Sequence, residues 1–482
     1  MFEIKDRDCL ARIAEFETVH GKVETPALMP VINPNKMTIS PRRLEDEFGT
    51  QMLITNSYVI YTDEDLRREA LDKGVHSLLD FSGTIMTDSG TFQAHVYGDI
   101  DVEPYEILNF QKKIGSDITT ILDRFTEPED PLELAEEKVD DTFQRAKKAV
   151  EDQSEDDEYL SLPLQGSIYP ELREESARKI GSLGGRTIYP IGGVVPLMES
   201  YRFSELSEII IASKRGLGPK GPVHLFGAGH PLILPLAVLL GCDLFDSSSY
   251  IKYARRGDFM FSNGTKNIDD LEHLYCSCSS CSSFSLKELK SMDQDERSVK
   301  IAEHNLWILF KEIDKIKQAI KEESLWELVE RRLRAHPHLF ESFEILNDRW
   351  DFLERYEPRS RKGAILYSGR ETLNRPVIKR LKNWIKNEYD QPVDGPTVLF
   401  EVDEEKKPYC RYLEDELKEI FDKTSVNLLA ETPLGPVPLE MDETYPIAQS
   451  VFPKNFEIDH SLECFLESKE IDDLIVWDGM ET

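Results

Sequence analysis

The sequence predicts an α/β fold: a (β/α)8 barrel of the TIM type with a zinc-binding insertion, followed by two small α+β modules at the C-terminus. Three observations lead to this prediction. Short β-rich runs alternate with helical patterns through the first half of the 482 residues, polar residues directly follow several of these runs, and three cysteines fall within six positions near residue 280.

The β-rich runs come first in the chain. Eight occur, at residues 52–55, 84–87, 118–122, 159–164, 187–191, 223–226, 242–245 and 259–261. Helical patterns lie between most of them, among them 131–150, 169–183 and 204–213. Alternation of strand and helix predicts parallel strands. Eight such strands over about 250 residues fit a closed barrel better than an open sheet.

Four of these runs are followed by a polar residue and a fifth by two glycines. The residues are Asp88, Asp123, Gln165, the pair Gly192 and Gly193, and Asp246. The carboxyl ends of barrel strands open on one rim, the face on which active sites form. We therefore expect these side chains to share one site.

The pattern changes after residue 300. Long amphipathic helices are predicted at 298–320, 325–335 and 346–356, and the next clear β run is 398–402. We predict a catalytic barrel over 1–345 with a zinc subdomain at about 270–310. A small α/β module over 346–430 and a small acidic module over 431–482 would follow.

Charge is unevenly distributed along the chain. The net charge is −33, from 91 acidic and 58 basic residues, which argues against a generic nucleic-acid binder. Residues 355–386 hold ten basic and two acidic residues, whereas residues 431–482 hold thirteen acidic and two basic ones. The basic span is either a phosphate-binding face or a solvated surface. There is no apolar run of 18 residues and no signal pattern, so we expect a cytoplasmic protein without a membrane span.

The cysteine cluster predicts a metal site. Cys276, Cys278 and Cys281 have C-x-C-x-x-C spacing, and the odd total of seven cysteines argues against a disulfide framework. Three thiolates and one imidazole form a closed tetrahedral site of the structural type, so we expect one structural zinc per chain. Spacing leaves the fourth ligand open between His304 and His273.

The carboxylates indicate chemistry at a sugar carbon. Asp246 follows an apolar run and is ringed by hydroxyl residues, so it is a candidate nucleophile. Asp88 has small neighbours and is a candidate for moving protons, as in glycosidases. Asp123 offers two acceptor oxygens to the N1–H and N2–H edge of guanine. The residues alone leave a glycosidase and a base-exchange enzyme both open.

Several segments together resemble the tRNA-guanine transglycosylase family. The resemblance is close over about 10–335 and looser over 362–376 and 434–449. The matching stretches include Thr87-Asp88-Ser89-Gly90-Thr91-Phe92-Gln93, Leu164-Gln165-Gly166-Ser167, Ile191-Gly192-Gly193-Val194-Val195-Pro196, His224-Leu225-Phe226-Gly227-Ala228-Gly229-His230-Pro231, Phe245-Asp246-Ser247 and Glu303-His304-Asn305-Leu306.

The resemblance implies a role for each candidate residue. Asp246 would attack ribose C1′ and hold the tRNA covalently, and Asp88 would be the general base. Zinc would be bound by the three clustered cysteines and His304. The continuation after Gly193 looks archaeal, which implies exchange of guanine at tRNA position 15 for 7-cyano-7-deazaguanine (preQ0), the first step of archaeosine formation. The residues expected to bind the base are Asp123, Gln165, Gly192, Gly193 and Phe92.

The resemblance also bears on partners. It suggests a homodimer. Archaeal members often carry a C-terminal RNA-binding PUA domain, and this chain ends at Thr482, about where that domain would begin. We therefore expect a form lacking the PUA domain, with a separate PUA-domain protein as a partner. The alternatives are a non-catalytic zinc-bearing subunit that positions tRNA, a relative that acts later in archaeosine synthesis, and an unrelated barrel hydrolase with a catalytic metal.

Overall fold

Two compact units make up the chain. The computed structural model describes residues 2–91, 102–154, 158–403, 406–413, 417–418, 425–454, 456, 469, 471 and 473–477. Unit 1 comprises Met1–Lys321 and Arg331–Ile345, and unit 2 comprises Glu322–Glu330 and Leu346–Thr482. Within the part of the chain that is described, no helix is both long and apolar enough to cross a membrane.

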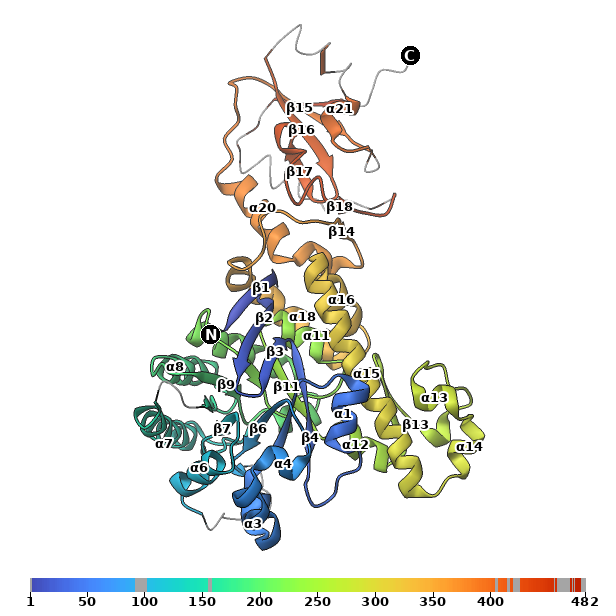
Figure 1. Ribbon diagram of the computed structural model, residues 1–482. Helices are drawn as coiled ribbons and strands as arrows, with labels where there is room; N and C mark the ends of the chain where they lie inside the picture. The colour runs from blue at the N-terminus through green and yellow to red at the C-terminus, as the bar shows by residue number, and fades with distance from the viewer. Residues whose placement is uncertain are drawn as a thin grey trace. The chain divides into compact units, whose positions relative to one another are not determined.

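Unit 1 is built on a closed barrel of eight parallel strands, which confirms the predicted barrel (Figure 1). The strands follow chain order around the barrel, which closes where the last pairs with the first, Asp246 opposite Met29. They are β4 (Ala27–Ile32), β5 (Met52–Asn56), β6 (Thr84–Asp88), β7 (Ile118–Thr120), β8 (Tyr159–Ser161), β9 (Thr187–Ile191), β10 (Val223–Leu225) and β11 (Leu244–Ser247).

Two of the barrel assignments made from the sequence need correction. Strand β4 was not among the predicted runs, and the predicted run 259–261 lies outside the barrel. That run forms β12 (Asp258–Phe261), which pairs antiparallel with β13 (Gly264–Asn267). Pro30 inside β4 has no N–H to donate, which removes the usual sequence signal of a central strand. The sequence of a short apolar run such as 259–261 does not show whether the strand belongs to a barrel or to a hairpin.

Helices surround the barrel. Helix α7 shows why they pack there: its buried residues 135, 139, 142, 146 and 149 recur every three or four positions and so form one apolar stripe. The helices from the first barrel strand to the last and just beyond are α1 (Pro41–Phe48), α2 (Ser57–Thr62), α3 (Glu64–Lys73), α4 (Val75–Leu79), α6 (Pro104–Lys113), α7 (Leu132–Glu151), α8 (Pro170–Gly181), α9 (Val195–Glu199), α10 (Phe203–Leu217), α11 (Leu234–Leu239) and α12 (Ser249–Arg255).

An antiparallel sheet closes the N-terminal end of the barrel. It contains β1 (Glu3–Asp8), β2 (Ala11–Thr18) and β3 (Gly21–Thr25). Phe16 and Val23 from this sheet share one buried core with barrel residues such as Met29 and Met86. The carboxyl ends of the strands are therefore the open rim.

The cysteine cluster lies in a small subdomain after the barrel. Its elements are β12, β13, η1 (Ile268–Asp270), α13 (Ser279–Ser283), α14 (Leu286–Ser291) and the start of α15 (Gln294–Glu322). Four further helices follow: α16 (Leu325–Leu333), α17 (Pro337–Phe340), α18 (Ser342–Asp348) and α19 (Trp350–Glu354).

Unit 2 contains a mixed four-stranded sheet in the order β17-β16-β15-β19. Its strands are β15 (Thr397–Glu401), β16 (Asn427–Thr432), β17 (Gly435–Pro438) and β19 (Leu474–Trp477), and β14 (Ile365–Leu366) pairs with β18 (Ser450–Val451). The expected boundary between residues 430 and 431 lies inside β16. The remaining elements are η2 (Arg370–Asn374), α20 (Pro376–Asn387), α21 (Tyr409–Tyr412) and η3 (Leu439–Met441).

The basic span at 355–386 does not form one exposed face, which corrects the simplest form of the phosphate-binding expectation. Arg375 is 2% exposed, and its guanidinium contacts Glu327 and Glu330 at 2.8 Å each. Arg361 is also buried and pairs with Glu327 at 3.0 Å. Buried charges of this kind are paired, so these two arginines hold unit 2 together.

Candidate active site and metal centre

One cavity of about 1240 Å³ in unit 1 collects the predicted catalytic and base-binding residues. Asp88 is the last residue of β6 and Asp246 lies in β11, while the others lie on the segments that follow β7, β8 and β9. Phe92 is outside the described residues. The members of the predicted set that line the cavity are Asp88, Asp123, Gln165, Gly192, Gly193 and Asp246.

Asp246 is held by two donors on the same oxygen. The Nε2 of His224 donates to Oδ1 at 2.8 Å, and the backbone N–H of Gly227 donates to it at 2.6 Å. His224 is completely buried in β10, next to β11, so its ring position is fixed by packing. Hydrogen bonds to the charged form stabilise a carboxylate. The carboxylate of Asp246 is thus held in one orientation at the cavity wall.

Asp88 lies in a setting that favours its protonated form. Asn56 Nδ2 donates to Oδ2 at 3.2 Å, and the Ser57 hydroxyl donates to the Asp88 backbone carbonyl at 2.7 Å. Burial, together with the negative charges of Asp123 and Asp246, raises the pKa of Asp88 to about 7. A carboxyl group with a pKa near neutrality can both release and accept a proton under working conditions.

Gln165 fixes the orientation of Asp123. The backbone N–H and hydroxyl of Thr126 donate to Gln165 Oε1 at 3.1 and 2.7 Å. The Gln165 amide therefore presents its Nε2 to Asp123 Oδ2, which accepts a hydrogen bond from it. Burial raises the pKa of Asp123, and the Gln165 and Thr91 hydrogen bonds oppose that rise. Asp123 is a buried acceptor set in one orientation.

Gly192 and Gly193 have to be glycine because atoms of Gln165 and Thr126 lie too close to leave room for a side chain. A Cβ on Gly192 would lie 2.4 Å from Gln165 Nε2. Gly193 has φ +70°, and a Cβ there would lie 2.5 Å from the backbone oxygen of Thr126. Any side chain at either position would push Gln165 or its support away from Asp123.

Three residues of the site received no role from sequence reasoning. His224 positions Asp246, and Phe226 lines the cavity with its ring 4.4 Å from the His224 ring. Arg173, fully buried, donates Nη1 to the carbonyls of Leu164 and Gly192, both at 2.8 Å. His224 and Phe226 belong to the stretch His224–Pro231 that resembles the family, but only their burial and contacts show what they do. Arg173 has the sequence pattern of an ordinary arginine on a helix surface.

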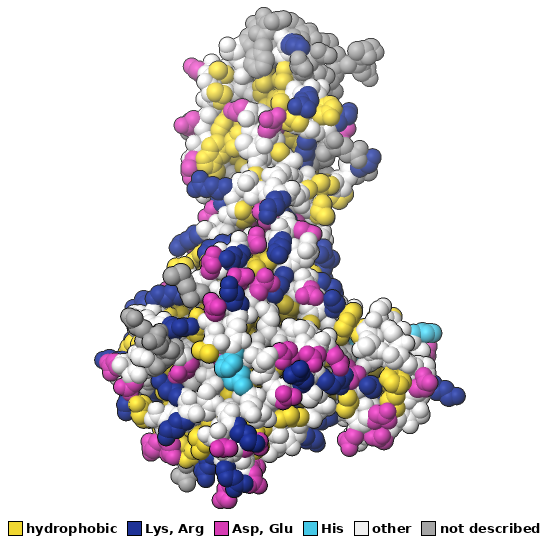
Figure 2. Space-filling view, in the orientation of Figure 1, with side chains coloured by type: hydrophobic (Ala, Val, Ile, Leu, Met, Phe, Trp, Pro, Cys, Tyr) yellow, Lys and Arg dark blue, Asp and Glu magenta, His cyan; other side chains and the backbone are white. Residues whose placement is uncertain are grey.

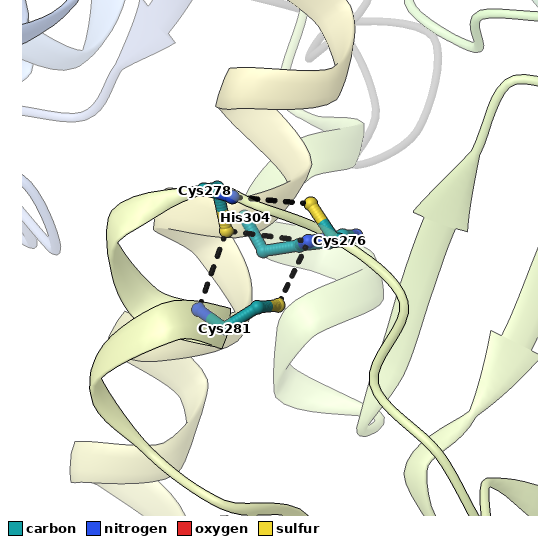
Figure 3. A group of neighbouring side chains, drawn as sticks. All are labelled: Cys276, Cys278, Cys281 and His304. Atoms are coloured by element: carbon teal, nitrogen blue, oxygen red, sulfur yellow. Dashed lines mark hydrogen bonds between the residues drawn. The ribbon is translucent and has the colours of Figure 1, made fainter.

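The cysteine cluster forms a compact donor set with His304, as Figure 3 shows. His304 Nδ1 lies 3.6 Å from the Cys278 sulfur and 3.4 Å from the Cys281 sulfur. Its Nε2 is 2.8 Å from the carbonyl oxygen of Met260 in β12. A carbonyl only accepts, so Nε2 carries the proton and Nδ1 presents its lone pair to the thiols.

These distances fit one tetrahedral ion. A sulfur and a nitrogen bound to the same zinc lie about 3.6 Å apart, given bonds of about 2.3 and 2.0–2.1 Å. The backbone N–H groups of Cys278 and Cys281 point at the sulfurs of Cys276 and Cys278, respectively, at 3.4 Å each. His273 is exposed and not part of the group. The residues present can hold a metal ion.

Comparisons with known proteins agree on one family. A family profile described as "Queuine tRNA-ribosyltransferase" matches residues 6–338. A Methanosphaera stadtmanae protein named tRNA-guanine(15) transglycosylase is 43% identical over 473 residues, which cover 95% of this chain and 68% of the relative. Proteins with the same name from Methanocaldococcus jannaschii and Pyrococcus furiosus are each 42% identical, over 99% and 95% of this chain and 72% of each relative.

Proposed function

Because the chain belongs to the queuine tRNA-ribosyltransferase family and is a tRNA-guanine transglycosylase, we propose that it replaces guanine at position 15 of tRNA with preQ0. We further propose that the exchange passes through a covalent bond between Asp246 and the ribose. One observation carries the proposal: a carboxylate held by two donors and a carboxyl group with a pKa near 7 line the same cavity.

The first half-reaction forms the covalent bond. An Asp246 oxygen attacks ribose C1′, and the C1′–N9 bond to guanine breaks. The leaving guanine takes a proton from the Asp88 carboxyl group, which becomes a carboxylate. His224 and the Gly227 N–H keep the attacking carboxylate in place during this step.

The second half-reaction reverses these events with a different base. The N9–H proton of preQ0 passes to the Asp88 carboxylate, N9 attacks C1′, and Asp246 is released. Asp123 accepts hydrogen bonds from the N1–H and N2–H edge shared by guanine and preQ0. Since Gln165 and the two glycines hold Asp123 in one orientation, they select that edge.

The metal centre has a structural role in this proposal. We propose one zinc per chain on Cys276, Cys278, Cys281 and His304, where it would cross-link the subdomain and leave no position for substrate. The homodimer and the separate PUA-domain partner stay predictions. Most of the acidic residues after 454 lie outside the described residues.

A base-exchange assay tests the proposed function. Purified protein is incubated with unmodified tRNA and radiolabelled guanine, then chased with unlabelled preQ0. We expect incorporation of label, its displacement by preQ0, and location of the new base at position 15 by nuclease mapping. A matched tRNA with adenine at position 15 is the control and should take up no label. Exchange at another position, or no displacement by preQ0, would overturn the assignment.

A further inference from the structure

A tyrosine at the edge of the cavity has a backbone conformation that its side chain disfavours. Tyr201 has φ 59°, in the left-handed region. Among the described residues other than glycine, the rest with positive φ are Cys9, Asp80, Ser167 and Glu323, none of them aromatic. A bulky residue in this region is uncommon and strained, so its presence needs an explanation.

The local hydrogen bonds show what the position requires. The N–H of Arg202 bonds to the carbonyl of Leu197 at 2.8 Å, and the N–H of Tyr201 bonds to that of Met198 at 3.3 Å. These two bonds define a Schellman motif at the end of α9, in which glycine or asparagine normally occupies the left-handed position. Tyrosine weakens the cap, so helix termination does not account for it.

The Tyr201 ring is braced and presented to solvent. It stacks on the ring of His336, with centroids 4.9 Å apart and planes 10° from parallel. The buried Phe203 contacts both rings edge-on, at 6.0 and 6.3 Å. Tyr201 is nevertheless 53% exposed. The sequence brings together residues 135 positions apart to support a flat aromatic surface that the fold leaves open.

The surface lies on the lining of the active-site cavity. Tyr201 and His336 line it together with Asp88 and Asp246. A nucleotide whose base enters such a cavity leaves the stack of its neighbours. Aromatic side chains restore stacking for nucleobases, and they accept any base because every base has a π face.

We propose that Tyr201, braced by His336, is a stacking platform for a tRNA nucleobase that flanks the exchanged guanine. The proposal rests on the proposed function, since it needs a tRNA whose target base enters this cavity. Tyr201 is a positioning residue in this scheme and takes no part in bond making. Strain at the helix end is retained because glycine, which would relieve it, offers no ring.

Substitutions at this position separate function from structure. Tyr201→Gly removes both the ring and the strain, so its melting temperature should equal or exceed that of the wild type. Its Kd for tRNA, measured by fluorescence anisotropy, and its KM for tRNA should rise about tenfold, the size of one lost base stack. The KM for guanine and the kcat should stay within about twofold of the wild type.

Two further variants sharpen the test. Tyr201→Trp keeps a flat ring, so its Kd for tRNA should lie within about twofold of the wild-type value. Tyr201→Leu has no ring, so its Kd for tRNA should rise as in Tyr201→Gly. Tyr105→Leu is the matched control, because Tyr105 is another exposed tyrosine, 42% accessible, whose ring centroid lies 4.8 Å from the Lys148 ammonium. We expect its Kd for tRNA to be unchanged.

The outcomes are distinguishable. Unchanged tRNA affinity in Tyr201→Gly would overturn the platform, and a lower melting temperature in that variant would show a structural role. A parallel rise in the KM for guanine would place the ring in the pocket of the exchanged base instead. A wild-type protein that binds tRNA without exchanging its guanine would refute the proposed function. Because the binding assay needs no turnover, comparing the Kd values of the Tyr201 variants would still test whether Tyr201 stacks on a nucleobase.

Discussion

At the scale of single residues, the pKa of Asp88 governs how the site responds to pH. Burial and the charges of Asp123 and Asp246 raise it to about 7. The free enzyme meets tRNA first, and Asp88 must then be protonated to give its proton to the leaving guanine. We predict that kcat/KM for tRNA falls as pH rises through a midpoint near 7, measured between about pH 5.5 and 8.5. A flat profile over this range would contradict the assignment.

The same pKa has a consequence for stability. In the unfolded chain an aspartate carboxyl group has a pKa of about 3.9. Between that pH and about 7, the folded protein therefore holds a proton on Asp88 that the unfolded chain has lost. The free energy of unfolding therefore falls as pH rises through this window. Asp88→Asn should lack exchange activity at every pH and should melt at a higher temperature than the wild type at pH 8, with little difference near pH 4. A lower melting temperature of the variant at pH 8 would contradict the raised pKa.

At the scale of elements, the metal centre joins three separate segments of the chain. Cys278 is the N-cap of α13, His304 lies in α15, and His304 also contacts β12. Closed cysteine-histidine sites contribute their binding free energy to folding. Cys278→Ala should therefore lose zinc, counted by mass spectrometry of the native protein, and lower the melting temperature together. Cys410→Ala in unit 2 is the control and should keep one zinc per chain; full zinc in Cys278→Ala would exclude it as a ligand.

Helices α16 and α20 are connected by buried charge. Arg375, the N-cap residue of α20, bonds Glu327 and Glu330 of α16, and Arg361 bonds Glu327 as well. Removing one partner leaves a buried charge uncompensated. We predict that Arg375→Met lowers the free energy of unfolding of unit 2 by about 3–5 kcal/mol, measured by urea denaturation. Lys386→Met, at an exposed position of the same helix, should change this free energy little. Equal losses in the two variants would show that the buried ion pairs of Arg375 do not stabilise unit 2.

The sequence specifies periodic elements and motif residues better than it specifies their pairing. Helices α7, α8 and α10 match the predicted ranges closely, because each carries an apolar stripe. Strand β4 could not be predicted from the sequence because Pro30 is not typical of a central strand. The contact of His224 with Asp246 and the burial of Arg375 within the basic span could not be predicted, since a histidine beside a carboxylate and an arginine inside a core have no local pattern. Their meaning depends on partners distant in the sequence.

At the scale of the whole molecule, an acidic protein must bind a polyanion. Figure 2 shows lysine and arginine side chains interspersed with acidic ones on the face in view. Exposed basic residues do lie along the cavity lining, namely Lys36, Lys252, Arg255 and Arg256. Phosphate contacts that position the tRNA can therefore come from the cavity edge, although the net charge is −33.

Salt dependence tests this distribution. Each phosphate contact that is removed lowers the slope of log affinity against log salt by about 0.7–0.9. The double variant Lys252→Ala/Arg255→Ala should lower it by about 1.5. The matched pair Arg359→Ala/Arg370→Ala, exposed in the basic span of unit 2, should leave the slope unchanged. The reverse pattern would restore that span as the phosphate-binding face.

The central claim is that Asp246 carries the tRNA as a covalent intermediate. The direct measurement is a denaturing gel of the protein mixed with labelled tRNA, comparing the wild type, Asp246→Asn and the control Asp65→Asn, an exposed aspartate of α3. The wild type and the control should each show a band at the summed mass of protein and tRNA. Asp246→Asn should fold, with an unchanged circular dichroism spectrum, and show none, because an amide is a poor nucleophile. A band of wild-type intensity in Asp246→Asn would contradict the mechanism.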